Sequence, residues 1–447
     1  MANATNLLLG FSGILLGNVK DVEDRPYKIM DAYFDGQRAR KRVSFNEYGF
    51  GQSRLPTSKS RFVVRPAPDL LYLTVWYDVS QYPLRLEGRI PDSYWSLSLF
   101  ADNTDCFFVK NDTEYNVGDI VVIYILGPQH DPSKITEPNA IIAQSPSTLG
   151  FGINRVLVED PRNDEMKYLQ YYKDFYSAKL ITTENLYKPL SRKEEKRTET
   201  LQSTTMYGSI AVLAGTLLLR NQRNATFLKN FITTALGSFI GYYISSNYFK
   251  KIAAPITDTF FNVRSTKSPS WWAMGSAGDP NADMYTRALI AEVGVFALTK
   301  DEAVYYFADA DDDGNRMHYL NDYEVIWDKE TVALPARWWS ITAYAQDNFL
   351  IKNDLGKYSY TPDKESSSNR FRFVFTSKSS EEAIASGLVT SEDEILPSGP
   401  AKDGRPYNSL SIRLYHPDKI LHTRKGLQNI ELPIIQIINN NISTSKL

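Results

Sequence analysis

Apolar and polar residues alternate along many short segments of the chain, and the clearest example occurs twice. Residues 94–112 read YWSLSLFADNTDCFFVKND, and residues 338–354 read WWSITAYAQDNFLIKND. In each copy, large apolar side chains share one side of an extended chain, and Ser or Thr occupies the other side. Each copy therefore predicts a strand, a polar turn and the start of a second strand. The match between them indicates an internal duplication.

Further strand patterns surround both copies, separated by turns rich in Gly, Pro, Asn and Asp. In the first half they cover residues 70–79, 83–88, 119–128 and 153–160, and a helical pattern follows over 164–180. In the second half, a short helix over 283–292 precedes strand patterns over 302–327, 371–377 and 409–417, with an acidic loop over 379–394. We therefore expect a mainly β protein with two duplicated antiparallel β-sandwich or jelly-roll-like domains and a few helices.

The middle of the chain differs in kind. Residues 200–219 and 230–249 contain no charged residue, and the basic segment RNQRNATFLK separates them. Twenty residues of helix span about 30 Å, the thickness of a bilayer core. The pattern predicts a two-helix membrane hairpin from Thr200 to Phe249, with both globular parts on the same side. A buried helical hairpin in a soluble domain is the alternative, because polar residues dilute the first segment.

These patterns divide the chain into an N-terminal segment (1–61), a first β-rich domain (62–186), a linker with the hairpin (187–251), a second β-rich domain (252–430) and a C-terminal tail (431–447). Residues 6–17 are apolar but follow no Lys or Arg, which favours a buried or membrane-apposed segment over a secretory signal. Residues 20–61 are charged and turn-rich.

Composition narrows the choice of partner and chemistry. The 50 basic and 52 acidic residues leave a net charge of −2, so nothing steers the whole molecule toward nucleic acid. The single cysteine, Cys106, excludes an intramolecular disulfide. The four histidines lack zinc-ligand spacing, and no nucleotide-binding or serine-hydrolase motif is present, so no cofactor is predicted.

One acidic motif needs a separate interpretation. Asp309, Asp311, Asp313 and Gly314 match the opening of a calcium-binding loop, whose closely spaced oxygens ligate the ion. Position twelve of that loop is Leu320 and not a bidentate Glu, and the flanking residues have strand patterns. A hairpin turn at Asp-Gly is therefore the preferred interpretation, with calcium as the weaker alternative.

Aromatic and polar residues supply candidate ligand-binding groups. Trp95 and Trp339 lie on the apolar side of their strands, which predicts core packing, whereas Trp338 faces the other way with Tyr344. An exposed Trp338 would offer a platform for a sugar or a lipid headgroup. An enzyme acting on such a ligand in a cleft between the halves would have further candidate polar groups, namely Tyr72, Asp78, Tyr285, Arg287 and Asp347.

At these same segments the chain resembles two bacterial families, the domains of unknown function 1254 and 1214, which are often encoded side by side or fused. The first half is similar to the former through PDLLYLTVWYDVS (68–80), YWSLSLF (94–100), YILGP (124–128) and QSPST (144–148). The second half resembles the latter through ADMYTRALIAEVGVFALTKDEAVYY (282–306), LPARWWSITAYAQDNFLIKNDLGKYSY (334–360) and SIRLYHP (411–417). The resemblance implies paired β-sandwich or jelly-roll-like domains, membrane-anchored or exported, with no established activity.

The expected function is thus a membrane-anchored binding or assembly protein, with both domains outside the cytoplasm and contacts to other protein subunits. The basic hairpin loop agrees with that side, whereas the Lys and Arg count of the flanks opposes it. An enzyme at an inter-domain cleft and a structural subunit of a larger complex are the alternatives. Whether the outward-facing Trp338 meets a ligand or the other half of the chain distinguishes these possibilities.

Overall fold

The structure is a computed structural model and describes residues 24–35, 44–50, 54–61, 63–160, 164–182, 262–274, 278, 287–288, 290–291, 294–328, 336–361 and 370–439. The predicted hairpin over 200–249, the apolar stretch 6–17 and Tyr285 lie outside the described residues. Within the described part of the chain, no helix is long and apolar enough to cross a membrane.

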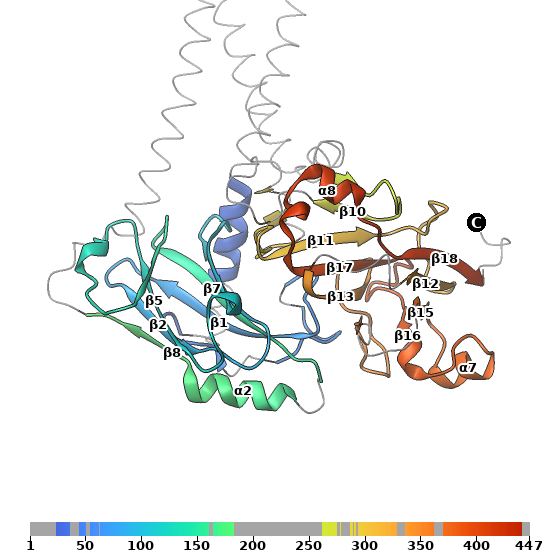
Figure 1. Ribbon diagram of the computed structural model, residues 1–447, viewed down its shortest axis with the longest axis horizontal. Coiled ribbons are helices and arrows are strands. Elements are labelled where there is room, and N and C mark those ends of the chain that lie inside the picture. Colours follow the sequence, from blue (N-terminus) through green and yellow to red (C-terminus); the bar gives the residue numbers. More distant parts are fainter. Residues whose placement is uncertain are drawn as a thin grey trace, which may run out of the picture.

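The first half forms two four-stranded sheets (Figure 1). Its elements are β1 (Leu70–Asp78), β2 (Leu84–Arg89), β3 (Trp95–Ala101), β4 (Cys106–Asn111), η2 (Asp112–Glu114), β5 (Ile120–Leu126), η3 (Pro132–Lys134), β6 (Ile141–Gln144), β7 (Leu149–Leu157), α2 (Asp164–Phe175) and β8 (Ser177–Leu180). One sheet has the order β1-β7-β3-β4, and the other has the order β6-β5-β2-β8. Neighbouring strands are antiparallel, except that β5 and β6 are parallel.

The second half has the same plan with additions at one edge. Its elements are β9 (Asn262–Arg264), β10 (Trp272–Met274), β11 (Ala303–Ala308), β12 (Asp322–Asp328), β13 (Ala336–Ala345), β14 (Ser359–Tyr360), β15 (Arg370–Thr376), α7 (Ser380–Ala385), η4 (Glu392–Glu394), β16 (Ile395–Pro397), β17 (Asn408–Pro417), η5 (Lys419–His422), α8 (Arg424–Asn429) and β18 (Ile434–Asn439). The sheet orders are β14-β13-β17-β11-β10-β9 and β16-β15-β12-β18. β15 and β16 are parallel, as β5 and β6 are.

The strand order confirms the predicted duplication. Strands β1 to β8 correspond in order and in sheet position to β11 to β18, and only β9 and β10 have no counterpart among the described strands. In the repeated stretch, β3 pairs with β7 as β13 pairs with β17. The chain is therefore mainly β, built twice on one topology.

Some predicted elements differ from the observed ones. The helical pattern over 164–180 ends at Phe175, because Ser177–Leu180 pairs with β2 at the edge of the sheet. Residues 24–35, which read as part of a turn-rich segment, form a helix whose Met30 and Phe34 are buried. Of the predicted helix 283–292, the described residues 287, 288, 290 and 291 are helical.

Each half has its own apolar core, which contains residues from both of its sheets. Trp95 lies in the first core, and Trp339 packs against the second, as the alternation predicts. The side chains on the opposite faces of β3 and β13 therefore point away from these cores.

Candidate functional site

The two halves meet through the sheet faces that point away from their own cores. Figure 1 shows the halves side by side, with β1 and β7 of the first on the side of β13 and β17 of the second. A shared apolar cluster joins Leu70, Tyr94 and Leu157 of the first half to Trp338 and Tyr415 of the second. The candidate functional site is therefore a buried junction between two copies of the same sheet.

Trp338 belongs to this junction. Its indole is 8% exposed, and it stacks on Tyr415 with ring centroids 4.6 Å apart and an interplanar angle of 22°. Tyr94 of the first half lies 6.0 Å from the same ring. The sequence correctly placed Trp338 outside its own core, but the prediction that it offers an exposed platform is wrong, because the other half covers it.

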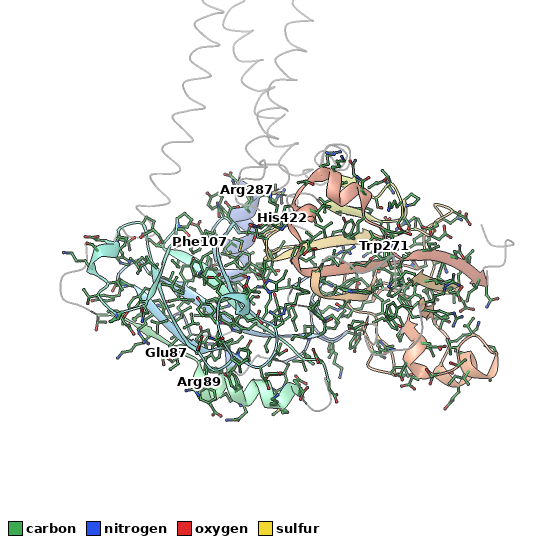
Figure 2. The ribbon with its side chains drawn as sticks, viewed as in Figure 1. Glu87, Arg89, Phe107, Trp271, Arg287 and His422 are labelled. Atoms are coloured by element: carbon green, nitrogen blue, oxygen red, sulfur yellow. The ribbon has the colours of Figure 1, made fainter. Side chains whose placement is uncertain are left out.

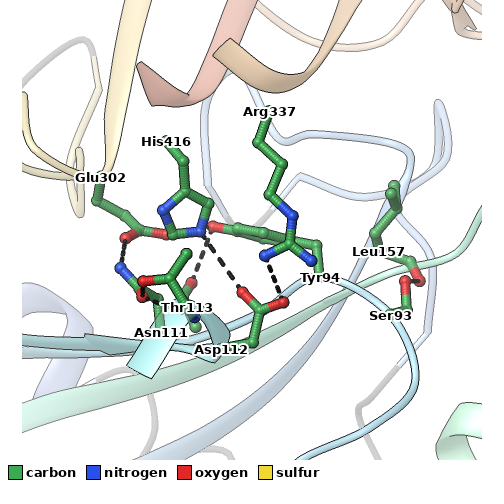
Figure 3. Close-up of polar contacts among 10 residues, drawn as sticks. Ser93, Tyr94, Asn111, Asp112, Thr113, Leu157, Glu302, Arg337 and His416 are labelled. Carbon is green, nitrogen blue, oxygen red and sulfur yellow. Dashed lines mark hydrogen bonds and ion pairs between the residues drawn. The ribbon is translucent and has the colours of Figure 1, made fainter. Parts of the chain in front are cut away.

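A carboxylate of the second half lies at one end of the junction (Figure 3). Glu302 is 1% exposed and directly precedes β11. Its Oε1 accepts a hydrogen bond from the Tyr94 hydroxyl at 2.5 Å, and its Oε2 accepts one from the Asn111 side-chain amide at 2.8 Å. Both donors come from the first half, so this contact joins the halves directly.

A second carboxylate makes the reciprocal contact. Asp112, at the end of the first repeated stretch, lies 2.6 Å from Arg337 Nη1 and 3.5 Å from His416 Nε2, both in the second half (Figure 3). His416 Nε2 also lies 3.8 Å from Glu302 Oε1. The imidazole therefore stands between an acid of each half. We call Tyr94, Asn111, Asp112, Glu302, Arg337 and His416 the junction cluster.

Burial and neighbouring charges shift the pKa values of Glu302 and Asp112 in opposite directions. Burial raises the pKa of Glu302, and the opposing influence of His416 does not cancel the rise. Burial would also raise the pKa of Asp112, but its contacts with His416 and Arg337 hold that pKa below the ordinary value. Burial and the neighbouring Glu302 carboxylate raise the pKa of the Tyr94 hydroxyl well above its usual range. The pKa of Glu302 is thus raised, and the pKa of Asp112 is lowered.

The backbone at His416 is strained. His416 has a φ of 48°, in the left-handed region that L-residues seldom adopt. Its backbone N–H donates to the Glu302 carbonyl at 3.0 Å, which fixes this conformation. Such strain costs about 1–3 kcal/mol and persists where surrounding contacts impose it. The fold therefore holds the imidazole in place beside both carboxylates.

The duplication also places an arginine at equivalent positions of the two facing sheets. Arg155 in β7 and Arg413 in β17 are each 4% exposed. Arg155 Nη1 donates to Ser98 Oγ at 2.9 Å, and Arg413 Nη1 donates to Thr342 Oγ1 at 3.1 Å. Ser98 and Thr342 are matching positions of the repeated stretch. The outward-facing Ser98 and Thr342 hydroxyls of the repeat therefore accept hydrogen bonds from the buried arginines.

Each of these arginines also reaches the other half of the chain. Arg155 Nη2 donates to the Phe296 carbonyl at 3.3 Å, and Arg413 Nη2 donates to the Arg65 carbonyl at 2.7 Å. Arg413 Nη2 also donates to Tyr344 Oη at 2.5 Å. Because buried guanidinium groups are costly unless hydrogen-bonded, these contacts fix the relative position of the two sheets.

The polar residues predicted to bind a ligand do not lie together in the structure. Tyr344 donates to the Pro66 carbonyl of the first half at 2.7 Å, and Tyr72 packs against the shared apolar cluster and accepts from the backbone N–H of Ala67 at 3.0 Å, so both lie at the junction. Asp78 accepts from the Ser80 N–H at the end of β1.

The remaining two members bridge the halves elsewhere. Arg287, labelled in Figure 2, donates from Nε and Nη2 to the two carboxylate oxygens of Asp105 at 2.8 and 2.6 Å. Asp347 pairs with Arg61 at 2.6 Å. Among the described members, Tyr72 and Tyr344 lie at the junction, whereas Asp78, Arg287 and Asp347 occupy turns and ion pairs.

The acidic motif forms a turn between β11 and β12. Ala310 and Arg316 form an isolated bridge, and Gly314 has a φ of 85°. The Asp311 side chain accepts from the Asn315 N–H at 2.8 Å, as a turn requires. This geometry agrees with the preferred hairpin interpretation, although only Gly314 of the Asp-Gly pair has a positive φ.

The sequence pattern predicted neither the junction cluster nor the two buried arginines. Arg155 and Arg413 carried a signal, since each is the only Asp, Glu, Lys or Arg in its strand. Glu302, Asp112 and His416 carried none, because each stands at a strand end, where solvent exposure is the ordinary expectation.

The fold and the junction define a class of protein in which two copies of one β topology face each other across a buried polar layer. Residues 46–178 match the family described as "Protein of unknown function (DUF1254)", and residues 302–419 match that described as "Protein of unknown function (DUF1214)". The chain carries both families in one polypeptide, in the predicted order.

A solved structure shares the fold. The crystal structure of the VPA0106 protein from Vibrio parahaemolyticus has a TM-score of 0.57 and 15% identity, covering 94% of this chain and 100% of that one. An uncharacterized protein from Burkholderia cenocepacia has a TM-score of 0.43 and 12% identity, covering 98% and 95%. No curated protein matches the chain. The first likeness shows the fold alone.

Proposed function

We propose that the chain is a membrane-anchored binding or assembly protein whose two halves, each a jelly-roll-like β-sandwich, act as one unit at an envelope. The observation that carries this proposal is the covered junction. The sheet faces that would line an inter-domain cleft bury Trp338 and Tyr415 against Tyr94 instead. The junction therefore serves to hold the halves together, and binding is left to outer surfaces.

The anchor follows from the sequence. Residues 200–219 and 230–249 lack charged residues, and they connect the two halves. A hairpin leaves both ends on the same membrane side, which is compatible with halves that contact each other closely. The basic loop at 220–229 and the family resemblance support placing the halves outside the cytoplasm.

Carbonate extraction of membranes from cells that express the full chain tests the anchor. We expect the protein to stay in the membrane pellet, and the double substitution Leu213→Arg and Leu236→Arg to release it, because each central Arg disfavours insertion by about 2.5–3.5 kcal/mol. Gln222→Arg with Asn224→Arg adds the same charge in the loop and should not release it. Complete release of the unsubstituted protein by carbonate would refute the anchor, and protease protection of intact cells tests the side.

A second candidate function is an enzyme acting on a carbohydrate or a lipid, and the junction cluster favours it. The pKa of Glu302 is raised, the pKa of Asp112 is lowered, and His416 lies between the two carboxylates, and acid–base catalysis uses pairs of acids whose pKa values are separated in this way. Opening of the junction would have to admit the substrate.

Assays of the full chain on panels of glycosides and lipid esters test this alternative. A hydrolytic activity of the cluster should fall about 10²–10⁴-fold in His416→Gln. Asp403→Asn is the matched control, because Asp403 is exposed and pairs with Arg405 away from the junction. An activity that His416→Gln leaves unchanged would not belong to this cluster.

A further inference from the structure

An exposed apolar side chain and several basic side chains share a small surface near the C-terminal end of the second half. Ile420 in η5 is 63% exposed, and Lys419, Arg424 and Lys425 are exposed with it. η5 and α8 contact each other, and the Ile420 carbonyl accepts from the Thr423 hydroxyl at 3.0 Å. We call Lys419, Ile420, Arg424 and Lys425 the η5–α8 surface.

Acidic groups also lie around this surface. Glu431 lies 3.5 Å from Lys267, and Asp301, with its side chain 75% exposed, lies 3.0 Å from His422 Nδ1. Asp418 is exposed at the start of η5 and opposes the basic charges. Lys419, Arg424 and Lys425 outnumber Asp418 and Asp301, so the surface keeps an excess of positive charge.

The η5–α8 surface is tied to the strand that follows the predicted hairpin. The Thr266 N–H donates to the Gln428 carbonyl at 2.7 Å, and the Ser265 hydroxyl donates to the Ile430 carbonyl at 2.8 Å. Residues 250–261 connect β9 to the end of the second apolar segment. At a maximum of about 3.6 Å per residue, this connection of 12 residues reaches no further than about 43 Å.

We propose that the η5–α8 surface contacts an anionic lipid bilayer, as a second membrane contact beside the hairpin. This inference rests on the proposed membrane anchor. Exposed apolar side chains insert at the headgroup boundary, and basic side chains near an anionic leaflet add electrostatic attraction. Ile420 supplies the first contribution, and Lys419, Arg424 and Lys425 supply the second. The contact orients the second half on the membrane surface.

A fluorescent label at position 420 tests the proposal in the full chain. Burial raises the pKa of the Cys106 thiol to about 12, so this native cysteine is unreactive and Ile420→Cys accepts the label selectively. The labelled protein is reconstituted into vesicles of neutral lipid or of neutral lipid with phosphatidylglycerol. We expect lipid-borne quenchers to reduce the emission more in the anionic vesicles, and this difference to disappear in about 1 M salt, where the Debye length is about 3 Å.

Matched variants separate the surface from general charge effects. Lys419→Glu, Arg424→Glu and Lys425→Glu together should abolish the quenching of the label at 420. Lys134→Glu, Lys173→Glu and Lys402→Glu change the net charge equally at exposed positions elsewhere and should preserve it. A label in Val117→Cys, which is 69% exposed in the first half, reports the background.

The outcomes distinguish this inference from the anchor. Protein that floats with the vesicles and resists carbonate, yet shows no more quenching at 420 than at 117, overturns the surface contact and leaves the anchor intact. Protein that does not float overturns the anchor and this inference together. A change in emission that depends on protein concentration without vesicles identifies a second copy of the chain as the occupant and also overturns the lipid contact.

Discussion

Glu302→Gln separates the charge of Glu302 from its shape. Gln keeps the length of the side chain, and its carbonyl still accepts the hydrogen bond from Tyr94 at 2.5 Å, whereas its NH2 group cannot accept the one from Asn111. Below the ordinary glutamate pKa, both residues are uncharged in the folded and unfolded states. We therefore expect the two proteins to differ there by no more than one ordinary hydrogen bond, about 1 kcal/mol.

The difference should change with pH because burial raises the pKa of Glu302. Above about pH 4.3 the unfolded chain loses the Glu302 proton, whereas the folded chain retains it up to its higher pKa. The folded state then binds more protons than the unfolded state, so the native protein loses stability as pH rises through this window. Relative to Glu302→Gln, the loss is about 1.4 kcal/mol for each unit between the two pKa values.

Asp112→Asn is a control for which the stability should change with pH in the opposite direction. Contacts with His416 and Arg337 hold the pKa of Asp112 low, so its ionised form stabilises the fold above about pH 3.9 and the stabilisation disappears as pH falls through the folded pKa. Replacing Asp112 should therefore cost most near neutral pH and least in acid.

Urea denaturation of both variants and the native chain, followed by tryptophan fluorescence in one detergent between about pH 4 and pH 8, measures these differences. As pH rises, we expect the free energy of unfolding of Glu302→Gln to increase relative to that of the native chain. We expect that of Asp112→Asn to decrease relative to the native chain. Parallel pH dependences of Glu302→Gln and the native chain would refute the reasoning, since they would mean that Glu302 titrates as it does in the unfolded chain.

Three further predictions concern contacts that join or shape the halves. Trp338→Ala should destabilise the fold by about 3–5 kcal/mol in a melting experiment, because the ring is 8% exposed and stacks on Tyr415, and a negligible change would contradict that burial. A double-mutant cycle of Arg287→Ala and Asp105→Ala should give a coupling of about 1.5–3 kcal/mol, since the contact is bidentate and the two side chains are only 28% and 14% exposed. Gly150→Ala should cost about 1–3 kcal/mol because its new Cβ would overlap Tyr77 and the Phe100 carbonyl, whereas Gly294→Ala, with its nearest atom at 3.9 Å, should be tolerated.

Alternation of apolar and polar residues predicted most of the strands, because each half buries one face of each sheet in its own core. Elements without such a stripe were missed. Helix α7 has one buried residue, Ala383, and begins in a segment that reads as an acidic loop. Its capping box is a local signal that would have identified it. The Glu382 N–H donates to the Ser379 side chain, and the Ser379 N–H donates to the Glu382 side chain.

The alternation of apolar and polar residues did not predict the junction, for a physical reason. Alternation assigns Ser98 and Thr342 to the side away from the core, and a polar side of an antiparallel sheet ordinarily faces water. Here the polar side is buried, because Arg155 and Arg413 use those hydroxyls and then donate to the opposite half. A charged residue in the middle of an apolar strand, repeated at the same place in both copies, needs a buried partner if the strand is central in its sheet. The duplication places one such arginine on each of the two facing sheets, so each half donates a hydrogen bond across the junction.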